Sequence, residues 1–363
     1  MKIAFDNQIF NQQKYGGISR YICSLAFHLS AEKIFEPQIF APLHLNAYLK
    51  GMPKGLVVGK QVPSIPKTGR AIQLVSRLLA RPLIRAFHPD ILHHTYYRPD
   101  IGAIGSARRV VTVYDMIHER YSELFPANDV TSAFKLSTVK AADHVICISE
   151  STRRDLIELF DIPAEKVSVI YLGFDRLHSD ANLVNSDKPY ILYVGHRGGY
   201  KNFSGFLKAY AHSSWLRNNF NILCFGGEPF SLAELRMFKE LGLLDHQVSR
   251  RIGSDSDLAD GYRGAAIFVY PSAYEGFGIP PLEAMSLNCP VACSNSSSIP
   301  EVVGEAGVYF DPLDIDSIQY TLEQTLSSPE RLSALVLMGK MRCLDFSWKQ
   351  CAEETAVIYK SLM

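Results

Sequence analysis

Residues 265–285 read AAIFVYPSAYEGFGIPPLEAM. The apolar run at 267–270 is rich in β-branched and aromatic residues, which predicts a buried strand. Pro271 ends this strand, and glycines at 276 and 278 frame a tight loop. The proline pair at 280–281 then opens a helix, because proline is tolerated in the first turn, where its missing N–H has no intrahelical partner. A strand, a glycine loop and a helix start in this order predict a phosphate-binding turn.

Two carboxylates flank this turn. Glu275 precedes it, and we place Glu283 in the first turn of the helix. Carboxylates accept hydrogen bonds from vicinal hydroxyls while backbone amides hold a diphosphate, so the arrangement fits a sugar nucleotide. The alternative is a helix with ordinary acidic residues near its N-terminus. The EGFG sequence that follows the first strand favours the functional interpretation.

The same order of strand, glycine turn and helix recurs elsewhere. Residues 2–10 read as a first strand followed by Gly16 and Gly17, and YILYVG at 190–195 restarts the pattern. Short apolar strands at 91–94 and 110–115 alternate with helices, which predicts doubly wound α/β domains. Polar side chains at the carboxyl ends of such strands face the ligand crevice. These residues are His93, His94, Tyr114, Asp115 and His118. Their spacing has no i,i+4 histidine pair or carboxylate-rich triad, so we predict no metal site.

YEGFGIPPLEAM at 274–285, with CPVACSNSSSIPEVVGEAGVYFDP at 289–312, resembles the E-x7-E signature region of family-4 retaining glycosyltransferases. That family, also called glycosyltransferase group 1, has the GT-B fold. The resemblance implies two doubly wound Rossmann-like domains that face a central cleft. The expected divisions are an acceptor-side domain at 1–174, a linker at 175–188, a nucleotide-sugar domain at 189–345, and a helix at 346–363 that crosses back to the first domain.

The resemblance also implies roles for single residues. Glu275 would contact the donor sugar and Glu283 the nucleotide ribose, while Arg197 and Lys201 would bind the donor phosphates. The alternative for the two cations is an ordinary loop on the surface. The implied donor-binding set is Gly16, Gly17, Arg197, Lys201, Ile252, Gly276, Phe277, Gly278, Ile279 and Glu283.

The strand at 110–115 departs from the family pattern. Many members carry histidine and then aspartate at the end of this strand, whereas here Tyr114 precedes Asp115, and His118 follows three residues later. We therefore take Asp115 and His118 as candidates for orienting substrate hydroxyls, beside Glu275 in the catalytic set.

The implied reaction transfers a sugar from a nucleotide diphosphate to a hydroxyl, with retention of the anomeric configuration and without a metal or other cofactor. By analogy, GDP-mannose is the first donor and a UDP-sugar the second. A lipid-linked saccharide of O-antigen, capsule or exopolysaccharide synthesis is the expected acceptor. A nucleotide-sugar epimerase or a phosphorylase fits the pair of glutamates less well. An inactive module that binds a membrane or a protein partner is the alternative from another class.

The composition of the chain indicates which partners and which cellular compartment to expect. The chain has 363 residues with 37 basic and 37 acidic side chains, so whole-molecule charge does not favour nucleic acid as a partner. Seven cysteines scattered through apolar runs indicate a reducing compartment. We expect no signal peptide and no membrane-spanning segment, and hence a cytoplasmic protein.

Residues 67–87, KTGRAIQLVSRLLARPLIRAF, contain five basic residues and no acidic one. Apolar side chains at 72, 75, 78 and 79 fall on one helical face, so the segment predicts contact with the anionic inner face of the cytoplasmic membrane. The alternative is a helix that packs on the N-terminal sheet and exposes a solvated basic face.

Overall fold

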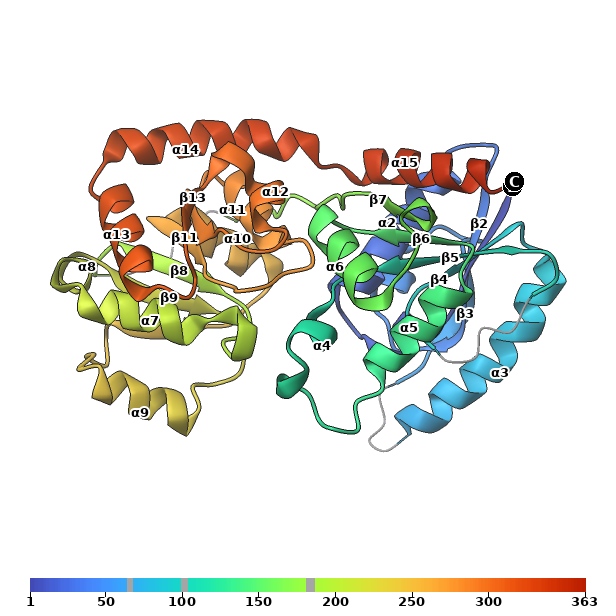
Figure 1. Cartoon of the computed structure of the whole chain (residues 1–363), viewed down its shortest axis with the longest axis horizontal. Coiled ribbons are helices and arrows are strands. Elements are labelled where there is room, and N and C mark those ends of the chain that lie inside the picture. Colours follow the sequence, from blue (N-terminus) through green and yellow to red (C-terminus); the bar gives the residue numbers. More distant parts are fainter. Residues whose placement is uncertain (64–67, 99–103, 181–186) are drawn as a thin grey trace. The chain divides into compact units, whose positions relative to one another are not determined.

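The computed structural model describes residues 1–63, 68–98, 104–180 and 187–363. The chain divides into two compact units (Figure 1). The first comprises Met1–Gly173 together with Phe346–Met363, and the second comprises Phe174–Asp345. Residues 181–186 of the predicted linker and Lys67 of the predicted basic helix lie outside the described residues.

The first unit contains a seven-stranded parallel sheet in the order β3-β2-β1-β4-β5-β6-β7. Its strands are β1 (Lys2–Phe5), β2 (Glu36–His44), β3 (Val57–Gln61), β4 (Ile91–His94), β5 (Arg108–Val113), β6 (His144–Cys147) and β7 (Val167–Val169). Its helices are α1 (Gln8–Gln12), α2 (Gly17–Ser30), α3 (Gly69–Phe87), α4 (Ile117–Arg120), α5 (Thr131–Ala141), α6 (Glu150–Phe160) and α15 (Trp348–Ser361).

The second unit contains a six-stranded parallel sheet in the order β10-β9-β8-β11-β12-β13. Its strands are β8 (Tyr190–Val194), β9 (Asn221–Phe225), β10 (Val248–Arg251), β11 (Ile267–Tyr270), β12 (Val291–Ser294) and β13 (Val308–Phe310). Its helices are α7 (Phe203–His212), α8 (Ser214–Asn219), α9 (Leu232–Glu240), α10 (Asp255–Gly264), α11 (Ile279–Ser286), α12 (Ile299–Val303), α13 (Ile315–Leu326) and α14 (Pro329–Arg342).

Strands with apolar side chains on both faces explain these sheets. All four residues of β11 and all four of β12 are buried, as is expected of parallel strands covered by helices on both sides. Helix α7 contributes Phe206 and Tyr210 to the same core as Ile191 of β8. The predicted strands at 91–94 and 267–270 are confirmed in position and type.

The first strand is shorter than predicted. β1 ends at Phe5, and a helix begins at Gln8, so the prediction of a strand over residues 2–10 is wrong beyond Phe5. The carboxylate of Asp6 accepts hydrogen bonds from the backbone N–H groups of Gln8 (3.3 Å) and Thr95 (3.1 Å). A side chain that captures backbone donors in this way turns the chain out of the sheet.

Each sheet has a point at which the strand order reverses. In the first unit it lies between β1 and β4, and in the second it lies between β8 and β11. Ligands of open α/β sheets bind outside the carboxyl ends of the strands at such points. The two reversal points are therefore the expected ligand sites of the two units.

Candidate active site

The reversal point of the second unit is formed by the loops that follow β8 and β11. The first loop runs from Gly195 into a single 3-10 turn at Gly199–Lys201, and the second runs from Pro271 to Gly278. The backbone N–H of Ala273 donates to the carbonyl of Tyr200 at 2.7 Å and joins the two loops. The predicted phosphate-binding turn is therefore part of a two-loop site.

Lys201 and Glu275 meet at this site. The ammonium Nζ of Lys201 lies 2.6 Å from Oε1 of Glu275. The ring of Tyr270, the last residue of β11, lies 5.8 Å from the same ammonium. Burial, followed by the charge of Glu275, raises the pKa of Tyr270 well above its usual value. The structure thus brings together two residues that sequence comparison alone assigned to phosphate and sugar.

A serine pair fixes the loop that carries Glu275. The backbone N–H of Glu275 donates to Oγ of Ser297 at 2.8 Å. Oγ of Ser298 donates to the carbonyl groups of Glu275 and Phe277, both at 2.9 Å. Ser297 thus accepts from the loop and Ser298 donates to it, so the loop has a defined shape before any ligand binds.

Gly278 allows the change from loop to helix. Its φ of +109° is a backbone conformation that residues with a side chain rarely adopt. Helix α11 begins at Ile279 and carries prolines in its first turn, as predicted. No acidic residue lies in that turn, so our placement of Glu283 in the first turn is wrong: as the fifth residue of α11, it lies in the second turn. Glu283 is buried, and its Oε2 accepts a 3.4 Å hydrogen bond from the hydroxyl of Tyr262 on α10.

Arg197 has different partners from Lys201. Its Nε donates to Oε1 of Glu234 on α9 at 2.5 Å, and its Nη2 donates to the carbonyl of Glu228 at 2.7 Å. Its guanidinium also lies 4.7 Å from the ring centre of Phe230. Nη1 is buried and has no hydrogen-bond partner among the described residues. The arginine is therefore held by α9 and the loop before it, with one donor left over.

The remaining donor-site candidates of this unit are placed as follows. Ile252 follows β10 directly and is 64% exposed, whereas Phe277 is buried. Arg251 ends β10, and its carbonyl accepts a 2.9 Å hydrogen bond from the N–H of Gly226, which follows β9. Gly276, Phe277, Gly278 and Ile279 all lie in the turn between β11 and α11 or at its end.

The candidates of the first unit lie on two separate elements. Gly16 and Gly17 form the start of α2. Asp115 follows β5, and its Oδ1 accepts a 3.1 Å hydrogen bond from the N–H of Ile117. The His118 ring stacks on the Phe125 ring with centroids 3.9 Å apart. His118 lines a cavity of about 460 Å³ whose described lining does not include Asp115. The structure therefore gives Asp115 and His118 different surroundings.

Three contributions to the site escaped the sequence analysis. They are the pairing of Glu234 with Arg197, the Ser297–Ser298 clamp, and the ring of Tyr270. The S-x-x-E pattern at 231–234 signals a helix start, and Glu234 does complete a capping box with Ser231, but nothing in the pattern reveals its second partner. Within the described ranges, no group of three or more histidine, cysteine, aspartate or glutamate side chains is arranged to hold a metal ion.

Comparisons with known proteins agree with this architecture. The profile of "Glycosyl transferases group 1" matches residues 175–340, and that of "Glycosyltransferase Family 4" matches residues 15–176. The O-antigen chain mannosyltransferase B of Escherichia coli is 30% identical over 95% of this chain and 96% of its own length.

Solved structures resemble the whole chain. A sucrose-phosphate synthase from Thermosynechococcus elongatus has a TM-score of 0.76 at 20% identity and covers 99% of this chain and 98% of its own. HepE from Anabaena, solved in complex with UDP-glucose, has a TM-score of 0.72 at 16% identity, and the match covers 99% of this chain and 100% of HepE. The chain therefore belongs to glycosyltransferase family 4, and its two parallel α/β units have the GT-B fold.

Proposed function

We propose that this protein transfers mannose from GDP-mannose to a hydroxyl of a lipid-linked saccharide in O-antigen synthesis, with retention of the anomeric configuration. The name of the E. coli relative supports the mannosyl group and the O-antigen setting. The Lys201–Glu275 pair at the strand-order reversal of the second unit is the observation that carries the proposal.

The chemistry follows from charge. When the bond between C1 of the sugar and the diphosphate oxygen breaks, positive charge develops on the sugar and negative charge on the leaving diphosphate. Lys201, Arg197 and the backbone amides of the Gly276–Gly278 turn supply positive potential for the diphosphate. Glu275 supplies a carboxylate for the sugar. Because cations and amides meet the charge requirement, we expect turnover without a metal ion.

The donor base is tested by thermal stabilisation of the protein with GDP, UDP, ADP and dTDP, each with and without EDTA. A ligand that binds only the folded state raises the free energy of unfolding by about 2.7 kcal/mol when its concentration is 100 times its dissociation constant. We expect GDP to raise the melting temperature and EDTA to change nothing. A shift with UDP alone would replace GDP-mannose by a UDP-sugar, the donor class that HepE carries in its structure.

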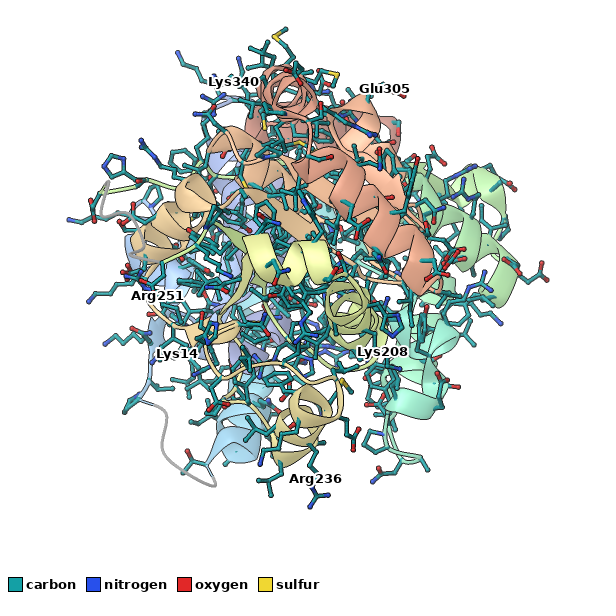
Figure 2. The ribbon with its side chains drawn as sticks, turned by 90° about the vertical axis from the view of Figure 1, so that its left-hand side faces the viewer. Lys14, Lys208, Arg236, Arg251, Glu305 and Lys340 are labelled. Atoms are coloured by element: carbon teal, nitrogen blue, oxygen red, sulfur yellow. The ribbon has the colours of Figure 1, made fainter. Side chains whose placement is uncertain are left out.

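A matched pair of lysine variants tests whether the nucleotide that raises the melting temperature binds at Lys201. Lys201→Ala should abolish the shift, whereas Lys208→Ala on α7, an exposed lysine of the same unit, should retain it (Figure 2). No shift with any nucleotide in the unaltered protein would favour an inactive module over an enzyme. The anomeric configuration of the product, read by NMR, tests retention.

We also propose that α3 attaches the protein to an anionic membrane surface. The helix buries Ser76, Ala80 and Ile84 and packs against β2, where the rings of Phe40 and Phe87 lie 5.4 Å apart. Outside this buried face, the helix carries large apolar side chains that are 39–62% exposed. They are Leu74, Val75, Leu78, Leu79 and Leu83. Figure 1 shows α3 at the periphery of the first unit.

Charge complementarity supports a lipid surface as the occupant of this face. Helix α3 contains no acidic residue, and Arg77, Arg81 and Arg85 accompany its apolar stripe. Basic side chains near an anionic leaflet contribute about 1 kcal/mol each, and apolar side chains insert at the headgroup boundary. In the part of the chain that the structure describes, no helix is both long and apolar enough to cross a membrane.

Co-sedimentation with vesicles tests the attachment. We expect the protein to bind vesicles that contain phosphatidylglycerol and to bind pure phosphatidylcholine weakly. Leu78→Glu should release it, whereas Leu232→Glu, at a leucine of the second unit that is 74% exposed, should not. Dimerisation that Leu78→Glu abolishes, without vesicle binding, would show that a second copy covers the face instead.

A further inference from the structure

A buried lysine links the segment after β5 to α4. Lys135, on α5, is only 1% exposed. A lysine is almost never buried to this extent unless its charge has partners. Its Nζ donates to Oε2 of Glu119 on α4 at 2.7 Å and to the backbone carbonyl of Asp115 at 2.9 Å. The ammonium group therefore connects Asp115, a candidate of the catalytic set, with both α4 and α5.

The carboxylate of Asp115 lies beside the same ammonium group. Its Oδ1 is 3.9 Å from Nζ of Lys135 and accepts the 3.1 Å hydrogen bond from the N–H of Ile117. The side chain of Asp115 is 30% exposed, whereas those of Lys135 and Glu119 are 1% and 6% exposed. Asp115 can thus contact a ligand, while the lysine and the glutamate are enclosed by protein.

The residue before Asp115 is fixed as well. The backbone N–H of Tyr114 donates to the hydroxyl of Tyr97 at 3.2 Å, and the ring of Tyr97 lies 5.5 Å from Nζ of Lys135. A cation near an aromatic ring is stabilised most where both are shielded from water. Two successive residues after β5 are therefore held by a tyrosine and a lysine that also contact each other.

The cost of burying this ion pair argues for a role beyond stability. Removing a lysine and a glutamate from water costs free energy that their attraction need not recover, and apolar side chains of similar volume are often at least as stabilising. Oε1 of Glu119 is also buried and has no hydrogen-bond partner among the described residues. The ion pair provides a directed donor to the carbonyl of Asp115, which an apolar pair would not.

From these contacts we infer that Lys135 is a positioning residue for the transfer reaction and acts through Asp115. The inference rests on the proposed transfer reaction and on Asp115 as a residue that orients a substrate hydroxyl. A group that orients a substrate acts only within hydrogen-bond reach, and a misplacement of about 1 Å can slow a reaction about 100-fold. Lys135 prevents such a displacement because it holds the backbone of Asp115 and lies beside its carboxylate.

Replacement of the whole ion pair tests the inference in the full chain. Lys135→Met alone leaves Glu119 buried without its counter-charge and can prevent folding, so the ion-pair variant combines Lys135→Met with Glu119→Met. Steady-state transfer from GDP-mannose to octyl α-D-mannopyranoside is measured. We expect kcat to fall about 10- to 100-fold. KM for GDP-mannose should stay the same, because Lys201 and Glu275 lie in the second unit. Lys140→Met, at an exposed lysine of α5, is the matched control and should keep kcat.

A comparison with Asp115→Ala shows whether the lysine acts through Asp115. If it does, adding the ion-pair replacement to Asp115→Ala should reduce kcat no further, because the residue that Lys135 positions is already removed. A lysine with a general structural role would reduce kcat by the same factor with and without Asp115. That result would overturn the inference, as would full kcat in the ion-pair variant.

Hydrogen exchange of the Ile117 N–H, read by NMR, reports the position of Asp115 without catalysis. This N–H donates to Oδ1 of Asp115, so it should exchange about tenfold faster in the ion-pair variant, and Lys140→Met should match the unaltered protein. Unchanged exchange in the ion-pair variant would show that Lys135 does not hold Asp115.

The same measurements separate the failure of this inference from that of the proposed function. If the exchange accelerates but the unaltered protein transfers no mannose and no nucleotide stabilises it, the transfer reaction is wrong and Lys135 still positions Asp115. If the unaltered protein and the ion-pair variant transfer mannose equally well, the transfer reaction stands and the role of Lys135 is wrong.

Discussion

Nζ of Lys201 and Oε1 of Glu275 are 2.6 Å apart, and the two residues come from loops that follow neighbouring parallel strands. The ion pair therefore joins the two sides of the strand-order reversal. In the proposed reaction an incoming sugar diphosphate separates the pair, because its phosphates attract the ammonium and its hydroxyls donate to the carboxylate. The pair keeps both groups in position while the site is empty.

Glu275→Gln tests the carboxylate. The change preserves the shape of the side chain but removes its charge, so the fold should persist and kcat should fall by about 10²–10³, as is typical when a group that stabilises developing charge is lost. Steady-state transfer with GDP-mannose measures the effect. The matched control is Glu330→Gln on α14, an exposed glutamate of the same unit that should leave kcat unchanged. Full activity of Glu275→Gln would remove this residue from the catalytic set.

Glu234 is predicted to act on phosphate binding through Arg197. It holds Nε of the guanidinium, and Nη1 remains the donor without a partner among the described residues. Glu234→Ala should weaken binding of the nucleoside diphosphate about tenfold, the scale of one charge-assisted hydrogen bond, while binding of the nucleoside should change little. Titration calorimetry of each variant with the nucleoside diphosphate and with the nucleoside measures the two affinities separately. Arg236→Ala, on the same helix and pointing outward in Figure 2, is the control.

Gly227→Ala provides an independent disturbance of Arg197. A Cβ atom at this position, where φ is +65°, would lie 2.9 Å from Nη1 of Arg197 and 2.9 Å from the carbonyl oxygen of Gly195. We expect the same selective loss of diphosphate affinity as with Glu234→Ala. Unchanged affinity in both variants would show that Arg197 has a structural role only.

His93 should make stability depend on pH. Burial lowers the pKa of His93 to about 3, whereas the unfolded chain titrates near 6.5. Between these values the unfolded state binds a proton that the folded state does not, so the free energy of unfolding falls as the pH falls from 6.5 towards 3, by up to about 1.4 kcal/mol per pH unit. Urea unfolding at pH 7.5, 5.5 and 4.5 measures the slope.

The variant His93→Gln isolates this contribution. It should lower stability at pH 7.5, because His93 lies within hydrogen-bond distance of the hydroxyls of Tyr359 (2.5 Å) and Thr112 (2.9 Å). It should also reduce the slope of the free energy of unfolding against pH between pH 6.5 and 4.5. His246→Gln, at an exposed position, should keep the slope of the unaltered protein. Equal slopes in the two variants would contradict the prediction.

All seven cysteines are free and buried, so they should resist thiol reagents in the folded protein. Burial raises the pKa of Cys23, Cys224 and Cys351 to about 12, which leaves little of the reactive thiolate at neutral pH. Titration with a chromogenic disulfide should detect almost no thiol before denaturation and seven afterwards. A thiol that reacts quickly in the folded state would reveal an opening of the core.

The sequence predicted an element correctly where the residues that cause it lie close together in the chain. The apolar run at 267–270, the prolines at 280 and 281 and the positive φ of Gly278 lie within one short segment, and the structure confirms the strand and the helix start there. The end of β1 was predicted wrongly because it depends on Asp6 contacting Thr95, a residue of another strand. The partner of Arg197 was missed for the same reason, since Glu234 lies on a helix beyond the next strand.

Helix α15, which follows the second unit in the sequence, completes the core of the first unit. Its Trp348 and Tyr359 are buried there, the ring of Trp348 lies 6.2 Å from that of Tyr21, and Tyr359 reaches His93. During synthesis from the N-terminus, residues 1–173 therefore leave the ribosome without the helix that covers them. The second unit can fold before α15 has been synthesised, when the core of the first unit is still incomplete. A chain that stops before Trp348 would expose Tyr21 and leave His93 without its hydroxyl partner, so quality control by proteases should remove truncated copies selectively.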